Sequence, residues 1–110
     1  MLSKDKRLNL KTDFKWAVSG TRLETKYITL FLKEGQTNSP RIGIASSSKV
    51  FKKAVERNRA RRLTSRAFED IYTKLPGSIN IVALPKTGIL SVKSEEVIKD
   101  LNEKIGYLFT

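Results

Sequence analysis

The sequence predicts an α+β fold in which helices pack on a small β-sheet as a two-layer sandwich. Short runs rich in β-branched and aromatic residues alternate with turn residues, which is typical of strands. Two longer segments, near 53–72 and 94–108, repeat apolar residues at helical spacing. A chain of 110 residues suffices for one domain with a modest core, so we expect a single domain over 1–110 in the order α-β-β-α-β-α.

The first helix is expected near residues 12–19. Thr12 or Asp13 can cap its start, because their side-chain oxygens accept hydrogen bonds from the free N–H groups of a first helical turn. Gly20 follows and is typical of the residue at which a helix ends.

Three strands are expected, and the first two span 26–33 and 41–46. Residues 34–40 between them read Glu-Gly-Gln-Thr-Asn-Ser-Pro, which are turn formers. The two strands are therefore expected to form an antiparallel hairpin with a long connection. The third strand, 78–84, is apolar enough to be central in a sheet, and Pro85 closes it.

A long basic helix is expected over 53–72, between the second and third strands, and Pro76-Gly77 prevents its continuation. At about 100° per residue, its apolar residues fall in one narrow sector and its cations in the broad arc opposite. The apolar sector contains Ala60, Leu63, Ala67 and Ile71. The opposite arc contains Arg57, Asn58, Arg59, Arg61, Arg62 and Arg66.

The last helix is expected to begin with Ser94 as its cap. Glu95 and Glu96 then lie in the first turn, where negative charge suits the helix dipole. Its apolar seam at helical spacing consists of Val97, Leu101, Ile105 and Leu108.

Positive charge is concentrated around the basic helix. The chain has 22 Lys and Arg against 11 Asp and Glu, a net charge of +11. Eight cations with only Glu56 among them give the segment 49–66 a charge of +7, and such like charge repels itself unless an anionic partner is bound. Guanidinium groups bind phosphates through paired hydrogen bonds, so we expect the partner to be a nucleic acid. Charge alone does not distinguish DNA from RNA, because both present phosphates. The cations are Lys49, Lys52, Lys53, Arg57, Arg59, Arg61, Arg62 and Arg66.

The composition excludes most protein-centred catalysis. Without Cys or His, the chain cannot form disulfides, thiol nucleophiles, zinc fingers or imidazole acid–base pairs. No residue is therefore assigned a catalytic or metal-ligating role. No apolar stretch approaches the roughly 20 residues of a membrane span, and the charged start lacks the apolar segment of a signal peptide. A cytoplasmic protein without a membrane partner is expected.

Two sets of residues leave alternatives open. Asn58 is either a neutral residue on the exposed helical face or a contact to a base edge, a 2′-hydroxyl or a hydrated metal ion. Phe14 and Trp16 are either core residues or platforms on which unstacked bases lie, and Trp16 points to another side of its helix, where partial exposure is expected. Within 27–32, Ile28, Leu30 and Leu32 share one face of the strand, and Tyr27, Thr29 and Phe31 share the other.

The segment Ala54-Val55-Glu56-Arg57-Asn58-Arg59-Ala60-Arg61-Arg62-Leu63 closely resembles the Arg-Asn-Arg signature of the bacterial ribonuclease P protein subunit. Supporting features include Arg7-Leu8, Arg41-Ile42-Gly43-Ile44, Ala67-Phe68 and the strand 79–83. The resemblance implies an α/β sandwich related to the second domain of ribosomal protein S5. It also implies a left-handed βαβ crossover, which the sequence itself cannot indicate because right-handed crossovers prevail.

The resemblance also implies a function. In this family a catalytic RNA with Mg²⁺ removes the 5′ leader of precursor tRNA, and the protein assists without being catalytic alone or needing another protein partner. Carried over by position, the signature residues Arg57, Asn58, Arg59, Arg61 and Arg62 would face the catalytic RNA, and the neighbouring cations Lys49, Lys52, Lys53 and Arg66 would join them. The single-stranded leader would lie in a cleft lined by Phe14, Val18 and Leu30.

This sequence departs from the family pattern at Ser65, where relatives often carry a basic residue, and in lacking a glycine within 47–53. A ribosomal or other structural RNA-binding protein is the alternative that composition alone fits equally well. A protein nuclease acting through Glu56, Glu69 and Asp70 is the second alternative. Its carboxylates are expected to pair locally or to be solvated.

Overall fold

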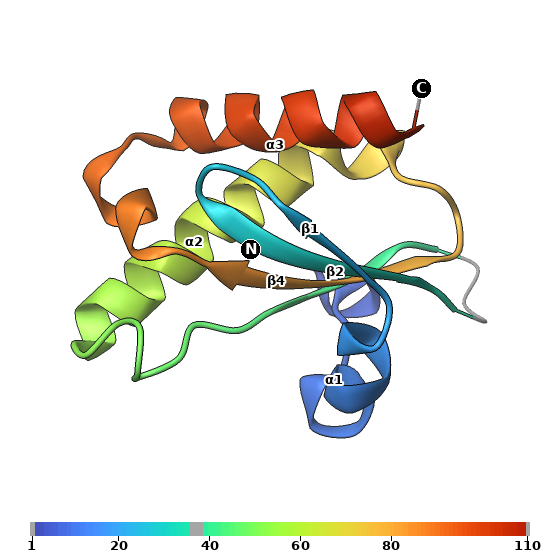
Figure 1. The fold of residues 1–110 in the computed structure, drawn as a ribbon, viewed down its shortest axis with the longest axis horizontal. Coiled ribbons are helices and arrows are strands. Elements are labelled where there is room, and N and C mark those ends of the chain that lie inside the picture. The colour runs from blue at the N-terminus through green and yellow to red at the C-terminus, as the bar shows by residue number, and fades with distance from the viewer. Residues whose placement is uncertain (1, 36–38, 110) are drawn as a thin grey trace.

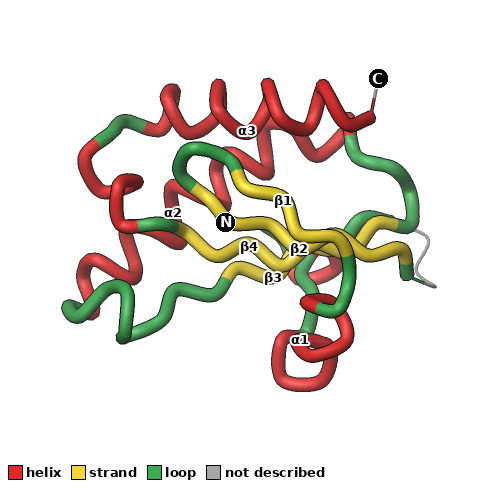
Figure 2. Tube along the Cα trace, in the orientation of Figure 1, coloured by secondary structure: helices red, strands yellow, loops and turns green. Residues whose placement is uncertain are grey.

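The computed structural model describes residues 2–35 and 39–109, with side chains described as far as Ile105. Figures 1 and 2 show a mixed sheet with helices on both sides. Short 3₁₀ segments occur at 4–6, 72–74 and 87–91. The longer elements are α1 (Leu10–Val18), β1 (Thr21–Glu24), β2 (Ile28–Glu34), β3 (Arg41–Ile44), α2 (Ala54–Ile71), β4 (Ile79–Pro85) and α3 (Ser94–Phe109). The α+β fold class is confirmed, and β1 is an additional strand that the sequence did not predict.

The sheet has the strand order β1-β2-β4-β3. β4 lies between β2, to which it is antiparallel, and β3, to which it is parallel. The expected hairpin between the second and third strands, β2 and β3, is therefore wrong. Residues 79–83 are all buried, so this strand needs neighbours on both sides and separates the two that are adjacent in sequence. The unit β3-α2-β4 is the βαβ crossover that the resemblance implies, and its handedness stays a prediction.

The main core lies between the sheet and the two long helices, which cover the same face in Figure 1. Both predicted seams are confirmed as buried except at Leu63, which is partly buried, and Leu108, which lies outside the described side chains. Phe68 of α2 is also fully buried, as are Ile28 and Leu30 of β2, whose side chains alternate toward this face. Among the described side chains, the fully buried apolar residues of α2 and α3 are Ala60, Ala67, Phe68, Ile71, Val97, Leu101 and Ile105.

The opposite face of the sheet carries α1 and a smaller core of Leu8, Ala17 and Val82. Gly43 lets the helix approach, because a Cβ atom there would lie 2.5 Å from Cδ2 of Leu10. The helix starts two residues earlier than expected, and its cap is neither Thr12 nor Asp13. Asn9 caps it, since its side-chain oxygen accepts a hydrogen bond from the Lys11 N–H at 3.1 Å.

Candidate nucleic-acid interface

The predicted two-sided character of α2 is present in the structure. Its buried side is closed by small residues that let the helix lie close to the sheet and α3, including Thr64 and Ser65, which are at most 1% exposed. No ion pair between two described residues involves an arginine of this helix. The positive charge of the helix is therefore available to an external anion. The predicted RNA-facing residues of α2 that are exposed are Asn58, Arg59, Arg61, Arg62 and Arg66.

Arg57 differs from the other arginines because its guanidinium turns back toward the chain. Nη1 donates to the carbonyl oxygens of Phe51 at 2.8 Å and Lys52 at 3.2 Å, and the side chain is half-buried. Ser46 Oγ donates to the Arg57 carbonyl at 3.2 Å. These bonds tie the loop before α2 to the helix. Since that loop presents Lys49, Lys52 and Lys53 in exposed positions, Arg57 fixes where three further cations lie.

Asn58 also acts on a neighbour. Its Oδ1 accepts a hydrogen bond from Arg61 Nη2 one helical turn away. The amide thereby holds one arginine in a set direction, and side-chain freedom that would be lost on binding is already restricted. The contacts to a base, a 2′-hydroxyl or a metal ion that the sequence left open for Asn58 stay predictions.

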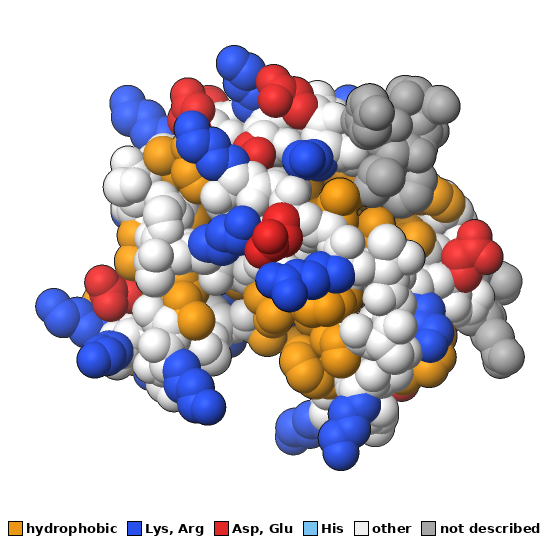
Figure 3. Space-filling view, in the orientation of Figure 1, with side chains coloured by type: hydrophobic (Ala, Val, Ile, Leu, Met, Phe, Trp, Pro, Cys, Tyr) orange, Lys and Arg blue, Asp and Glu red, His pale blue; other side chains and the backbone are white. Residues whose placement is uncertain are grey.

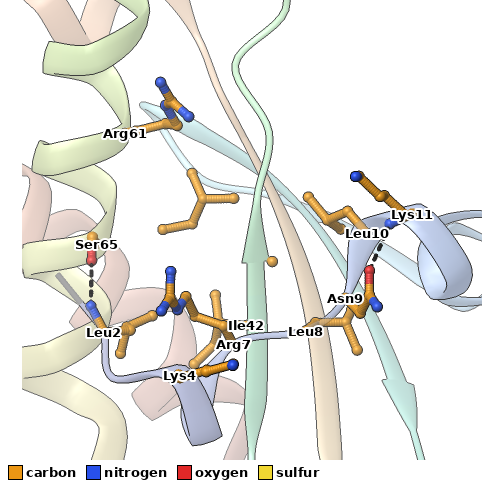
Figure 4. A pocket seen from close by; sticks show the side chains of 12 residues that line it. Leu2, Lys4, Arg7, Leu8, Asn9, Leu10, Lys11, Ile42, Arg61 and Ser65 are labelled. Atoms are coloured by element: carbon orange, nitrogen blue, oxygen red, sulfur yellow. Dashed lines mark hydrogen bonds between the residues drawn. The ribbon is translucent and has the colours of Figure 1, made fainter.

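Arg61 points into a groove between α2 and the N-terminal segment, shown in Figure 4. The hollow, of about 510 Å³, has Ile42 and Gly43 of β3 as its floor. Ser65 Oγ accepts a hydrogen bond from the Leu2 N–H at 3.1 Å and so joins the two walls. The groove is apolar in its centre and cationic at its edges, the cations being Lys4, Arg7, Lys11 and Arg61.

A second hollow, of about 420 Å³, continues from the first beyond Ile44 and Arg61, which line both. Phe14 of α1 and Val50 of the loop before α2 face it, and they are 37% and 45% exposed. Figure 3 shows the corresponding indentation between α1 and the start of α2, with hydrophobic surface inside and Lys and Arg side chains on both lips. The two hollows together form a groove that suits an extended chain with an anionic backbone and with bases whose flat faces can lie on apolar side chains.

The three predicted cleft residues lie in different places. Phe14 lines the groove, whereas Val18 is half-buried in the small core under α1. Leu30 is fully buried in the main core on the opposite face of the sheet, so its placement in the cleft is wrong. Strand alternation reverses the face at every residue, and the β2 residue on the α1 side is Phe31. Leu84 of β4 lines the groove, together with residues 42–44 of β3.

Sequence analysis did not single out the cations of the N-terminal segment. Lys4, Arg7 and Lys11 reach the groove because Leu2 is buried and Arg7 forms an isolated parallel bridge with Ile42 of β3. The alternation of cations with Leu2, Leu8 and Leu10 was the available signal, and only the tertiary fold gives it meaning. Nearby, a hydrogen bond from the Ser3 hydroxyl lowers the pKa of the Asp5 carboxyl, with smaller contributions from Lys6 and Arg41.

The described residues contain no group of three His, Cys, Asp or Glu that could hold a metal ion. Glu56 and the other carboxylates of α2 lie on a helix whose arginines dominate the local field. Within the same part of the chain, no helix has the length and apolar character needed to cross a bilayer.

Comparison with known proteins identifies the family. The family model described as Ribonuclease P matches residues 2–108. The chain belongs to the ribonuclease P protein family. The ribonuclease P protein component of Pseudanabaena sp. is 34% identical over 103 residues, which cover 92% of this chain and 89% of that relative. The component of Pseudoalteromonas atlantica is 29% identical over 102 residues, covering 92% of this chain and 84% of the relative.

Solved structures of ribonuclease P proteins have the same fold. The protein from Thermotoga maritima gives a TM-score of 0.79 at 24% identity, covering 90% of this chain and 94% of its own. The protein from Staphylococcus aureus gives 0.79 at 18% identity, covering 96% of this chain and 98% of its own. As a ribonuclease P protein component, the chain functions in 5′ processing of tRNA as a subunit of a ribonucleoprotein endoribonuclease and associates with the ribonuclease P RNA.

Proposed function

We propose that the exposed cations of α2 and of the loop before it dock this subunit on phosphates of the catalytic RNA. Arg59, Arg61, Arg62 and Arg66 are exposed, and no ion pair with another described residue neutralises them. The loop lysines at 49, 52 and 53 extend the same cationic surface. Each phosphate contact releases condensed counterions, so binding to this surface depends on salt.

Within this surface, Arg57 and Asn58 act as positioning residues as well as charges or polar contacts. Arg57 holds the loop through the Phe51 and Lys52 carbonyls, and Asn58 holds Arg61. A pre-organised cluster loses less side-chain entropy on binding than free arginines would. The Arg-Asn-Arg order thus places one residue against the loop, one against a neighbouring arginine and one toward the RNA.

The single-stranded leader of precursor tRNA is proposed to lie in the groove beside α1. Phe14 offers an exposed aromatic face to a base, and Arg61 stands where the two hollows of the groove meet. Lys4, Arg7 and Lys11 border the hollow of about 510 Å³ and would neutralise the leader's phosphates. Val18 supports Phe31 beneath the helix, so its contribution is to the shape of the groove.

The cleavage itself is assigned to the RNA. Since the described residues hold no metal-ligand cluster, we propose that Mg²⁺ in the holoenzyme is held by the RNA and that the protein lowers phosphate repulsion around it. The cytoplasm is the proposed location, and no further protein subunit is required.

Reconstitution tests this proposal. The protein is mixed with its cognate ribonuclease P RNA, and cleavage is measured on two precursor tRNAs that differ only in whether they carry a long or a one-nucleotide leader. Phe14→Ala should lower kcat/KM for the long leader and leave the short one unchanged, whereas Arg62→Ala should lower RNA affinity and affect both substrates alike. Lys99→Ala, on the exposed side of α3, is the control. Equal losses on both substrates for Phe14→Ala would exclude leader binding in the groove, and cleavage by RNA-free protein would exclude the RNA as catalyst.

A further inference from the structure

The helix α1 divides its face of the sheet into two areas. Phe14 borders the groove described above, whereas Asp13 and Trp16 lie on the other side of the helix and line a separate hollow of about 800 Å³. Trp16 is 39% exposed, which confirms the partial exposure expected from its position on the helix. Nothing in the proposed function uses this hollow beside Trp16.

The floor of this hollow is a row of polar residues across three strands. In the sheet register, Lys33 of β2 and Arg41 of β3 are both partners of Asn80 in β4. The next row toward the leader groove consists of Phe31, Val82 and Gly43, and α1 packs over it. The polar row therefore forms a defined edge of hydrogen-bonding groups beside the indole ring.

Asn80 is fixed in place. Its side chain is 2% exposed and Nδ2 donates to the Ser78 carbonyl at 3.3 Å. Gly35 lies directly against it, since a Cβ atom at Gly35 would be 1.9 Å from Nδ2 and 3.3 Å from the Trp16 ring. Only glycine leaves room there for both the amide and the indole.

Arg41 contributes an unsatisfied donor. Its Nε is buried and has no hydrogen-bond partner among the described residues. Buried donors in folded proteins are nearly always paired, so this unpaired one needs an explanation, and a water or a bound group next to the guanidinium is one. On β2, Lys33 Nζ lies over one face of the Trp16 ring, 5.1 Å from its centre, and donates to Ser19 Oγ at 2.7 Å, which holds the lysine on that face.

The charge of this hollow differs from that of the RNA-docking surface. Asp13 and Glu34 balance Lys33 and Arg41, so the lining has no net charge. A phosphate would gain little from a balanced site, whereas a neutral ring with donors and acceptors on its edges would be matched. Guanine is such a ring. Its N1–H and N2–H₂ groups can donate to a carboxylate, and its O6 and N7 atoms can accept from a guanidinium.

We propose that this hollow binds an unpaired guanine base of RNA, stacked on the face of Trp16 opposite Lys33, with Asp13 accepting from its Watson–Crick edge and Arg41 donating to its other edge. The proposal rests on the proposed function only in taking RNA as the source of the base. A strand that leaves the leader groove can pass over α1 and place one base here, and the exposed aromatic residues on the two sides of the helix then hold two parts of the same strand.

The chain carries a single tryptophan, so its fluorescence reports on this hollow directly. The protein alone is titrated with GMP, AMP, UMP and ribose 5-phosphate. We expect saturable quenching with GMP bound about 5-fold or more tightly than UMP, and no competition from ribose 5-phosphate. Asp13→Asn should remove the preference for GMP, and Glu103→Gln, an exposed carboxylate on α3, should keep it.

Each contrary outcome overturns the proposal. Equal competition by ribose 5-phosphate would make the hollow a phosphate site, and the absence of saturable quenching by any nucleotide would mean that no base binds. Retention of the GMP preference in Asp13→Asn would exclude the assigned edge contact. Because the titration needs neither the ribonuclease P RNA nor precursor tRNA, its result is independent of whether reconstituted cleavage succeeds.

Discussion

Arg57 and Arg62 belong to the same basic helix, yet the structure predicts different consequences for their removal. Arg57 donates to two carbonyl oxygens of the preceding loop, whereas Arg62 is exposed and makes no hydrogen bond with another described residue. Arg57→Ala should therefore reduce both stability and RNA binding, and Arg62→Ala should reduce binding alone.

The stability effect follows from the two hydrogen bonds of Arg57, at 2.8 and 3.2 Å. Hydrogen bonds from charged donors contribute about 1.5–3 kcal/mol each when well formed, and this side chain is half-buried, so we expect a net loss of about 1–3 kcal/mol. In a domain of this size each kcal/mol corresponds to roughly 4–8 °C in Tm. Arg62→Ala should remain within about 0.5 kcal/mol of the parent.

The binding effect follows from counterion release. Loss of one phosphate contact lowers the magnitude of the slope of log K against log[salt] by about 0.7–0.9. When salt rises from about 50 to about 200 mM, the affinity of such a variant should therefore fall roughly threefold less than that of the parent. The assays are thermal unfolding by circular dichroism and salt-dependent binding of the ribonuclease P RNA. Arg57→Lys separates the two roles, because it keeps the charge without the guanidinium fork that reaches both carbonyls. Full stability in Arg57→Lys and Arg57→Ala would refute the tethering role, and an unchanged salt slope in Arg62→Ala would refute its phosphate contact.

Further substitutions test the scaffold by chemical denaturation. Phe68→Ala should cost about 3–5 kcal/mol, because the ring is fully buried in the main core, and a loss below about 1 kcal/mol would contradict that packing. Ser65→Arg should cost about 1–3 kcal/mol, since Ser65 is buried and accepts a hydrogen bond from the Leu2 N–H. A variant as stable as the parent would show that the N-terminal segment can move aside at no cost in stability. Asp100→Ala should cost about 1.5–3 kcal/mol, because its carboxylate accepts from the backbone N–H groups of Lys26 and Tyr27, both at 3.0 Å, and Asp100→Asn should recover part of the loss.

Local patterns accounted for the elements that carry the docking surface. The seam of α2 and the seam of α3 follow from helical spacing, and their bounds agree with expectation to within one residue at the start of each helix. The exposure of Arg59, Arg61, Arg62 and Arg66 follows from the same periodicity. These features depend on residues close in sequence, so a periodic pattern is sufficient to find them.

Interactions between distant parts of the chain were not accessible in this way. The inward turn of Arg57 depends on where the loop carbonyls lie, and the helical angle alone placed it with the exposed arginines. The face assigned to Leu30 depended on which side of the sheet α1 covers, and strand alternation gives two faces without saying which is which. For Arg57 the choice lies between an inward and an outward side chain, and for Leu30 between the two faces of the sheet. The local sequence favours neither alternative in either case.

The insertion of β4 between β2 and β3 explains both the failed hairpin prediction and the existence of the hollow beside Trp16. Had the sequence-adjacent strands paired, Lys33 and Arg41 would lie on neighbouring strands without Asn80 between them. The βαβ crossover that carries α2 brings β4 into that position, because parallel neighbours require a long connection. The helix that supplies the RNA-docking cations is therefore also the connection that assembles the polar row beside Trp16, so the docking surface and the proposed base site arise from one topological step.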